Sequence, residues 1–559
     1  MRRILVLCTA AALALTGCVK VDSNLGEGLV DKSLLFDTYI AEFPLEEIQM
    51  RMAEDLSGYS STRVTLGAIR DDVFGLTTRE SAFSLIPVLD TLDLGTDPKA
   101  VSLQLYLALD TLSCADASQQ RILQNVYVTE LTEQLPTDDV RTTREIAHGT
   151  ELVTDGLPVI NGTDGLFITF KPSFAQKYVD AIQQLGPVLK DRSDEDGEDD
   201  YERFLAMMPG IHLRTDEPKG NGGRINLFEL SCLSVSNNYY YRNNNLAALT
   251  VHSSWNGVEK DSLFLMVPGE AEFVDEASAI HDNTGFTQYA FNRTGHQTAN
   301  GMAADGHIYV EGGGGLKPVI LASELERKAG EAIRAAGGDP GKAVIIKASI
   351  VLPIDLPENG DFSLLDDYPS LLSPTIRAAV KSEEDGKEYV SFAGLTDASV
   401  STENQGDIDR ANLQYAPDIT YHLQQILSPE RDSNGTDIED YNIWLLIIHS
   451  QKVANASGSL YDNEYYQQLL YASYYNSLYG GGYGYGGYGY GSYGYGSYGS
   501  YNSNYYSYMM LAQMMAASSQ QSYSYTTELD KDRYYKGTLC GPGNGRHPSF
   551  RVVYAIPKD

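Results

Sequence analysis

One stretch of the chain decides its fold class: Ala100-Val101-Ser102-Leu103-Gln104-Leu105-Tyr106-Leu107-Ala108-Leu109-Asp110. Apolar side chains occupy every second position from Val101 to Leu109. Because successive side chains of a strand point to opposite faces, this period places the apolar set on one face. A helix would instead repeat its apolar positions every three or four residues. The stretch therefore predicts a β-strand with one buried face.

Other segments extend this prediction along the chain. The same alternation occurs from Phe550 to Ile556, and Ile443 to Ile448 is a continuous apolar run typical of a strand covered on both faces. Residues 375–392 resemble a hairpin with Asp385-Gly386 in its turn. Two short helices are expected as well. Each opens with a capping-box pattern and ends before a glycine: Ser173 with Gln176 before Gly186, and Ser323 with Glu326 before Gly337.

Similar residues open two of the strongest strands: Asp97-Pro98-Lys99-Ala100-Val101 and Asp339-Pro340-Gly341-Lys342-Ala343-Val344. Two β-sandwiches of related topology would explain this similarity. We expect a mainly β fold of two jelly-roll-like antiparallel β-sandwich domains with a few short helices, at residues 36–230 and 231–559. Residues 455–527 consist largely of Tyr, Gly, Ser and Asn and lack the aliphatic residues of a core. They predict a long disordered insertion in a loop of the second domain.

The N-terminus has the features of a secretory signal peptide. Arg2 and Arg3 precede an apolar run of twelve residues from Ile4 to Leu15, which is shorter than the roughly 20 residues that cross a bilayer. The run ends in Leu15-Thr16-Gly17-Cys18. A cysteine in this context resembles the lipobox of bacterial lipoproteins. The resemblance implies removal of residues 1–17, acylation of Cys18, and a tether over residues 18–35 that makes the membrane a partner.

Charge and cysteine content narrow the possible partners. The formal net charge of −34 repels phosphates, so we expect no nucleic-acid binding. Of five cysteines, Cys8 leaves with the signal peptide and Cys18 carries the lipid. Cys114, Cys232 and Cys540 remain, and they allow at most one intramolecular disulfide, whose partners the sequence leaves open.

No motif identifies a catalytic, metal or cofactor site. The acidic loop of residues 191–202 fails the EF-hand pattern, because Arg192 and Arg203 stand where acids are needed. Gly312 to Gly315 lacks the Lys-Ser/Thr of a phosphate loop and is expected to form a turn. The histidines show no metal-ligand spacing, there is no Gly-x-Ser-x-Gly motif, and 75 acidic residues make any carboxylate pair arbitrary. We therefore expect no catalytic residues, no metal, no cofactor and no enzymatic activity.

Three short triplets are candidate modification sites. Asp90-Thr91-Leu92, Asp110-Thr111-Leu112 and Asp261-Ser262-Leu263 resemble the O-glycosylation acceptor of Bacteroidetes. That resemblance implies glycans on the hydroxyls of Thr91, Thr111 and Ser262.

Several segments together resemble a family of Bacteroidetes lipoproteins, domain of unknown function 4270. They are Leu66 to Ile69 with Phe74 to Thr78, Val126 to Leu131, Phe204 to Thr215, Ile308 to Gly312, Ile345 to Pro353, Tyr441 to Leu446, and Arg551 to Tyr554. The resemblance implies a mostly β, exported lipoprotein without an established activity. A fainter likeness connects Ile345 to Leu352 and Asp418 to Leu427 with carbohydrate-associated jelly rolls.

We therefore expect an outer-membrane lipoprotein with a non-catalytic binding or structural role at the cell envelope, its partner a glycan or an envelope protein. Glycan binding is the main alternative within that class, and an envelope hydrolase acting on polysaccharide is the alternative outside it. Lys20 and Asp22 alternate with Val19 and Val21, a pattern that leaves open which face of the outer membrane carries the protein. An aromatic platform would favour binding, and a deep cleft with two facing carboxylates would favour hydrolysis.

Overall fold

The computed structural model describes residues 36–87, 92–137, 139–187, 200–236, 239–242, 245–271, 286–303, 306–356, 362–381, 388–400, 404–428, 437–453 and 524–558. Several expectations fall on segments outside these residues: the signal peptide, Cys18 and its tether, Thr91, most of the acidic loop, the Asp385-Gly386 turn and most of residues 455–527, which we call the Tyr/Gly tract.

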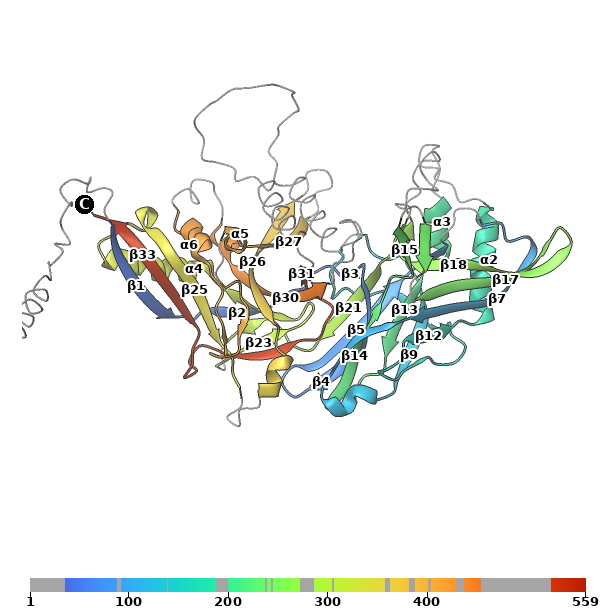
Figure 1. The fold of residues 1–559 in the computed structure, drawn as a ribbon, viewed down its shortest axis with the longest axis horizontal. Helices are drawn as coiled ribbons and strands as arrows, with labels where there is room; N and C mark the ends of the chain where they lie inside the picture. The colour runs from blue at the N-terminus through green and yellow to red at the C-terminus, as the bar shows by residue number, and fades with distance from the viewer. Residues whose placement is uncertain are drawn as a thin grey trace, which may run out of the picture.

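The expected mainly β, antiparallel fold is confirmed, and the first sandwich packs two sheets face to face (Figure 1). Its larger sheet has ten strands: β3 (Tyr59–Ser60), β4 (Arg63–Asp71), β5 (Gly75–Phe83), β8 (Leu109–Cys114), β9 (Gln124–Leu131), β10 (His148–Leu152), β11 (Val159–Ile160), β13 (Ile211–Thr215), β14 (Gly222–Glu229) and β21 (Ala290–His296). Its smaller sheet has five: β6 (Leu85–Pro87), β7 (Thr96–Leu107), β12 (Leu166–Thr169), β17 (Leu246–Trp255) and β18 (Val258–Pro268). One apolar core joins both sheets to helices α2 (Pro172–Leu185) and α3 (Asp200–Met207), and the short 3-10 helix η2 (Ala117–Arg121) follows β8.

The second sandwich is built in the same way around its own core. A five-stranded sheet contains β1 (Phe36–Pro44), β33 (Ser549–Pro557), β25 (Val344–Pro353), β29 (Gln414–Tyr415) and β28 (Ile408–Asp409). A seven-stranded sheet contains β22 (Gly301–Met302), β2 (Ile48–Met52), β24 (Leu316–Ile320), β30 (Ile443–Val453), β26 (Leu371–Lys381), β27 (Glu388–Gly394) and β31 (Ser524–Leu529). The helices of this part are α4 (Ala322–Ala335), α5 (Asp397–Val400), α6 (Thr420–Ile426), η4 (Pro340–Lys342), η5 (Phe362–Asp366) and η6 (Ile438–Tyr441).

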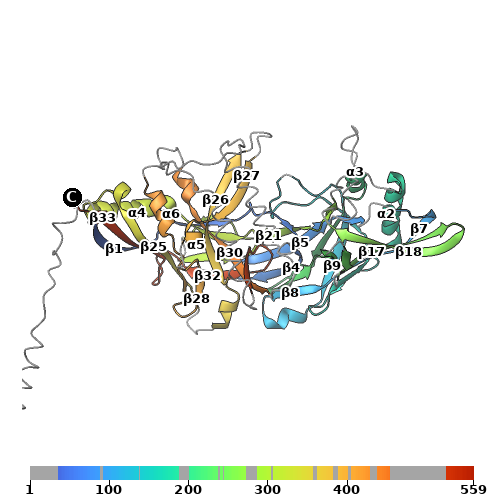
Figure 2. The same ribbon diagram turned by 45° about the horizontal axis from the view of Figure 1, so that its top comes forward.

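Three strand pairs stand apart from the four large sheets: β23 (His307–Glu311) with β32 (Lys536–Cys540), β15 (Leu233–Ser236) with β16 (Tyr239–Arg242), and β19 (Glu270–Ala271) with β20 (Phe286–Thr287). The two sandwiches follow one another along the long axis of the molecule (Figures 1 and 2).

The stretch from Ala100 to Asp110 forms strands as predicted, but these strands, β7 and β8, belong to two different sheets. Leu103, Leu105 and Leu107 of β7 are fully buried, whereas Val101 is 47% exposed. After Leu107 the chain leaves the smaller sheet, and β8 pairs with β14 in the larger one. Ala108 lies at the crossing, where its amide donates to the Asn245 side chain (2.7 Å). The alternation thus marks buried positions correctly only from Leu103 to Leu107, because the chain changes sheets after them.

The division between the sandwiches differs from the expected boundary at residue 230. Strands β17, β18 and β21 lie after that residue, yet they pair within the first sandwich. Strands β1 and β2 come first in the described chain, yet they belong to the second sandwich. Strand β1 pairs with the C-terminal strand β33 along its whole length, from Phe36 opposite Pro557 to Pro44 opposite Ser549.

Both expected helices form, but neither expected capping box does. Helix α2 begins after Lys171 and α4 after Leu321, and neither preceding residue caps its helix with a side chain. The Gln176 side chain instead accepts a hydrogen bond from the Ala100 amide (2.8 Å), which ties α2 to β7. Tertiary contact with a strand therefore takes the side chain that a capping box would use.

The expected insertion connects two strands that pair with each other. Strand β30 ends at Val453, strand β31 begins at Ser524, and these two residues are partners in the antiparallel register. The insertion is therefore shorter at its end than predicted, because residues 524–527 are part of β31. Residues 454–523 lie outside the described part of the chain.

Candidate functional site at the junction of the sandwiches

A short segment crosses between the sandwiches directly after β31. We call this segment, Asp530 to Tyr535, the junction strap. It leaves the second sandwich at β31 and continues into β32. On its way the Lys531 ammonium donates to the main-chain carbonyls of Ser57 (2.9 Å) and Tyr59. The strap thus fastens the first sandwich to the segment that follows the Tyr/Gly tract.

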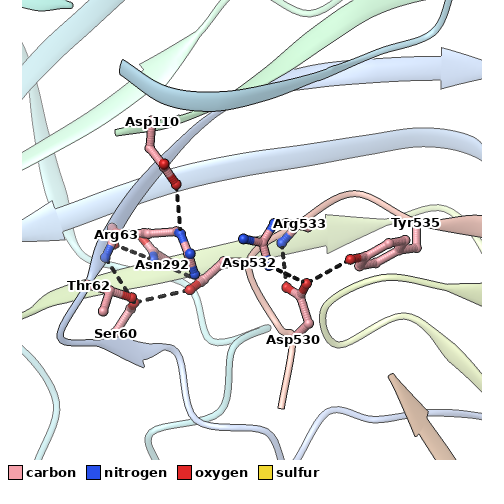
Figure 3. A network of polar contacts seen from close by, with 9 residues as sticks. All are labelled: Ser60, Thr62, Arg63, Asp110, Asn292, Asp530, Asp532, Arg533 and Tyr535. Atoms are coloured by element: carbon pink, nitrogen blue, oxygen red, sulfur yellow. Dashed lines mark hydrogen bonds and ion pairs between the residues drawn. The ribbon is translucent and has the colours of Figure 1, made fainter. Parts of the chain in front are cut away.

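Asp532 binds the first sandwich through two side chains. It is buried, and its carboxylate accepts hydrogen bonds from the Ser60 hydroxyl (3.1 Å) and the Asn292 amide (3.2 Å). Asn292 also donates to the Arg63 carbonyl (2.8 Å) and accepts from the Thr65 amide (3.2 Å). Figure 3 shows this network, in which Asn292 of β21 connects β4 with the strap. A buried amide with its donors and acceptors satisfied fixes one relative position of these segments.

Asp530 shapes the strap itself. Its buried carboxylate accepts from the Arg533 amide (3.0 Å), the Arg533 guanidinium (2.9 Å) and the Tyr535 hydroxyl (2.9 Å) (Figure 3). Burial raises the pKa of Tyr535, and the hydrogen bond to Asp530 raises it further, so this hydroxyl remains a donor. At the other end of the network, Arg63 forms an ion pair with the partly exposed Asp110 (3.2 Å).

Arg79 of β5 is a deeply buried cation of the junction. Its side chain is 1% exposed, and its guanidinium nitrogens have no hydrogen-bond acceptor within the described residues. Burial lowers the pKa of Arg79 to about 10, while Asp532, Asp530 and Glu311 act in the opposite direction. Gly313 lies against the guanidinium, where a Cβ would come within 2.6 Å of Nη2. The strap carboxylates thus compensate this charge electrostatically and without direct contact.

The glycine run forms the expected turn, which also holds a cation. Gly312 to Gly315 connects β23 with β24, and the Lys317 ammonium donates to the carbonyls of Glu311 (2.5 Å), Gly313 (2.9 Å) and Gly315 (2.9 Å). Burial lowers the pKa of Lys317 to about 7. The turn therefore presents carbonyl oxygens to an internal ammonium, whereas a phosphate loop presents amides to an anion.

A buried histidine stands between this turn and the surface. The His296 ring is 1% exposed, with Nδ1 3.4 Å from the Glu311 carboxylate, which the Thr298 hydroxyl also contacts. Burial lowers the pKa of His296, so the neutral ring is favoured. Its Nε2 atom is buried and has no partner among the described residues.

Two hollows adjoin one another at the surface beside the network, and together we call them the junction groove. Their volumes are 390 and 380 Å³, and they share Met52, Glu54 and Asn300. The first hollow is further lined by Arg51, Asp55, Arg377, Glu439, Asp440, Asn442 and Trp444. The second is further lined by Thr143, Arg293, Thr294, Gly295, His296, Thr298 and Ala299. Both sandwiches therefore contribute to the groove, and its two halves meet at residues 52–54.

The first hollow is polar and slightly acidic. Two arginines face four carboxylates there, which gives a formal charge of −2. Arg377 forms an ion pair with Asp55 (2.7 Å), so this cation is already compensated. Trp444 is 6% exposed and packs edge-on against Phe392, with ring centroids 5.4 Å apart. The hollow thus offers both hydrogen-bond donors and hydrogen-bond acceptors, beside an aromatic ring that is mostly buried.

The residues selected from the sequence lie elsewhere. Thr111 is half-buried on β8, and Ser262 is half-buried on β18 between the exposed Asp261 and Leu263. Cys114, Cys232 and Cys540 are all free thiols in this structure. Across the described ranges, no three His, Cys, Asp or Glu side chains are grouped closely enough to hold a metal ion.

Sequence reasoning missed the junction because its members are far apart in the chain. Ser60 and Asp532 are 472 positions apart, and Asn292 and Asp532 are 240 positions apart. The available signal was the Asp-x-Asp pair, Asp530 and Asp532, directly after a low-complexity tract. The same spacing also occurs at Asp194 and Asp196 and at Asp407 and Asp409, so the pair by itself does not identify the junction.

Comparison with known protein families, curated proteins and solved structures found no match to this chain. Within the described residues, none of the helices has the length and apolarity needed to cross a membrane.

Proposed function

We propose that this chain is a lipid-anchored, non-catalytic binding protein of the cell envelope whose junction groove takes a neutral glycan. The observation that carries the proposal is a polar groove lined by both sandwiches beside a buried network. Sugar hydroxyls both donate and accept hydrogen bonds, and the lining supplies amides, guanidinium groups and carboxylates for both roles. The excess of carboxylates in the first hollow disfavours acidic polysaccharides.

The rigid setting of the groove supports binding. Residues that line a ligand site bind more tightly when they need no reordering, because the entropic cost of association falls. The Thr298 hydroxyl, which lines the second hollow, donates to the buried Glu311 carboxylate, and the amide of the next residue, Gly312, donates to the Tyr535 carbonyl of the strap (2.9 Å). Membership in the lipoprotein family of unknown function, the signal peptide, Cys18 acylation and an outer-membrane location belong to the same proposal.

Binding is tested on a glycan array with the purified chain from residue 18 onward, followed by calorimetry on any neutral glycan retained. Asn300→Ala combined with Asp440→Ala should abolish binding. Both residues are exposed at the groove, so losing the hydrogen bond from the Met52 amide to Asn300 (2.6 Å) should cost at most about 1.5 kcal/mol of stability. Asp366→Ala is the matched control, since it removes an exposed carboxylate paired with Arg410 outside the groove. Equal binding by the double variant and the parent would refute the groove as the site.

The same preparations separate binding from catalysis. A glycan that is retained should be recovered intact, and release of reducing ends over time would instead identify a hydrolase.

Cys18→Ala tests the anchor, because loss of acylation should move the protein from the membrane fraction to the soluble fraction. A variant that still sediments with membranes after a salt wash would contradict the tether.

A further inference from the structure

An exposed apolar surface lies at one end of the outer face that strands β1, β33 and β25 form in the second sandwich. Phe36 and Ile40 of β1 are 45% and 82% exposed, and Val344 and Ile346 of β25 are 45% and 51% exposed. The two strands flank β33, to which both are paired. We call this surface the seat face. Single apolar residues scattered over a protein surface need no explanation, but four large ones on one sheet face do.

The backbone directs these side chains outward. In β1, Tyr39, Ala41 and Phe43 face the core, so Phe36 and Ile40 point away from it. In β25 the register shifts between Ile345 and Lys347, where an irregularity leaves both Ile346 and Lys347 exposed. The sandwich core is complete without the seat face, so folding alone does not account for its apolar residues.

The seat face is where the described chain begins. Phe36 is the first described residue. The segment before it that starts at Cys18, the candidate for acylation, is residues 18–35, which are 18 residues. Even when fully extended, 18 residues span at most about 60–65 Å. Figures 1 and 2 show β1, β33 and β25 at one end of the long molecule. A tether at Cys18 therefore holds this end, more than any other, close to a lipid surface.

Local charge agrees with that placement. On β1, β33 and β25 the charged residues that share this outward face are Glu42 and Arg551, which pair at 3.0 Å, and Lys347, and their formal charges sum to +1. The whole chain carries −34. An anionic lipid surface repels most of the protein but does not repel this face.

We propose that the seat face rests on the lipid bilayer to which Cys18 tethers the chain, so that the junction groove is held away from the membrane. This inference rests on the lipid anchor of the proposed function. Contact with lipid would bury the four apolar side chains at the headgroup boundary, as monotopic proteins bury theirs.

Fluorescence quenching of dyes at single positions tests whether the seat face contacts lipid. Single cysteines replace Ile40 and Ile346 on the seat face, and Val258 and Leu263 on the opposite sandwich serve as matched exposed controls. Cys114 is changed to Ser, and each cysteine carries an environment-sensitive dye. The acylated full chain is placed on vesicles of brominated phosphatidylcholine with phosphatidylglycerol. Because a seated face sinks about 5–10 Å into the headgroup–acyl boundary, bromine should quench dyes at positions 40 and 346 but not those at 258 and 263.

A second way of tethering the chain distinguishes a seat face that does not contact lipid from a Cys18 that is not acylated. A hexahistidine tag in place of Cys18, bound to nickel-chelating lipid, should give the same quenching pattern without acylation. Adding Val344→Asp and Phe36→Asp should abolish quenching at position 40 on either tether. Equal quenching at all four positions, or none at any, would overturn the seat. Sedimentation that shows dimers formed through position 40, with no lipid quenching, would overturn it in favour of a second copy of the chain.

Discussion

Removing the Asp532 carboxylate should weaken the whole junction. In Asp532→Ala the Ser60 hydroxyl and the Asn292 amide lose their acceptor at 3.1 and 3.2 Å. Hydrogen bonds to a charged group contribute about 1.5–3 kcal/mol each. Arg79, buried without a direct partner, also loses one of its compensating charges. Removing one member of a buried charge pair costs about 3–5 kcal/mol. These contributions overlap, so we expect the free energy of unfolding to fall by about 3–5 kcal/mol.

The chain contains its own reporters for this experiment. It has two tryptophans, Trp255 on β17 of the first sandwich and Trp444 on β30 of the second. Trp444→Phe leaves one tryptophan, in the first sandwich, and Trp255→Phe leaves one, in the second, so the urea unfolding of each sandwich is followed in its own variant. In the parent the two transitions should coincide. In Asp532→Ala they should separate, because the strap no longer couples the sandwiches.

Lys177→Ala is the control, since Lys177 forms an exposed ion pair with Glu130 on the first sandwich. Exposed pairs contribute at most about 1 kcal/mol, and their loss should leave the transitions coincident. A loss below about 1 kcal/mol in Asp532→Ala with both tryptophans still unfolding together would refute the coupling role of the strap.

Four further perturbations follow from the structure. Gly406→Ala should destabilise the second sandwich by more than the roughly 1–2 kcal/mol of left-handed strain, because φ is +105° and a Cβ would lie 1.9 Å from a main-chain oxygen. Gly543→Ala, at φ +84° in open space, should show the strain alone in a denaturant titration. Burial holds the pKa of His422 below its usual 6.5, so the unfolded state takes up its proton first. Stability present above pH 6.5 should be lost as the pH falls below that value, and the drop in melting temperature between pH 7 and 5 should be smaller in His422→Gln. Deleting residues 478–502 should leave the melting temperature within a few degrees of the parent, since the flanking strands pair directly and loop length costs little; a loss of cooperative unfolding would show that the tract is structural.

The sequence by itself determined the position of several strands and of both predicted helices, and most of the side chains that they bury. Local periodicity was sufficient for β33, where Phe550, Val552 and Tyr554 are buried as predicted, and for the apolar run that begins at Ile443. The apolar faces of both helices and the turn at Gly312 to Gly315 followed in the same way. These features depend on neighbours a few residues away, and such neighbours are adjacent in any fold the chain adopts.

Only the tertiary structure decided which strands share a sheet. Strand β1 gives no local sign that it pairs with β33 at the far end of the chain, and β8 gives none that it leaves the sheet of β7. The junction shows the same dependence, because Asp532 acquires its role only where Ser60 and Asn292 meet it. A carboxylate in the sequence carries its charge, but burial and partners decide what that charge does. Both are set by contacts between residues hundreds of positions apart.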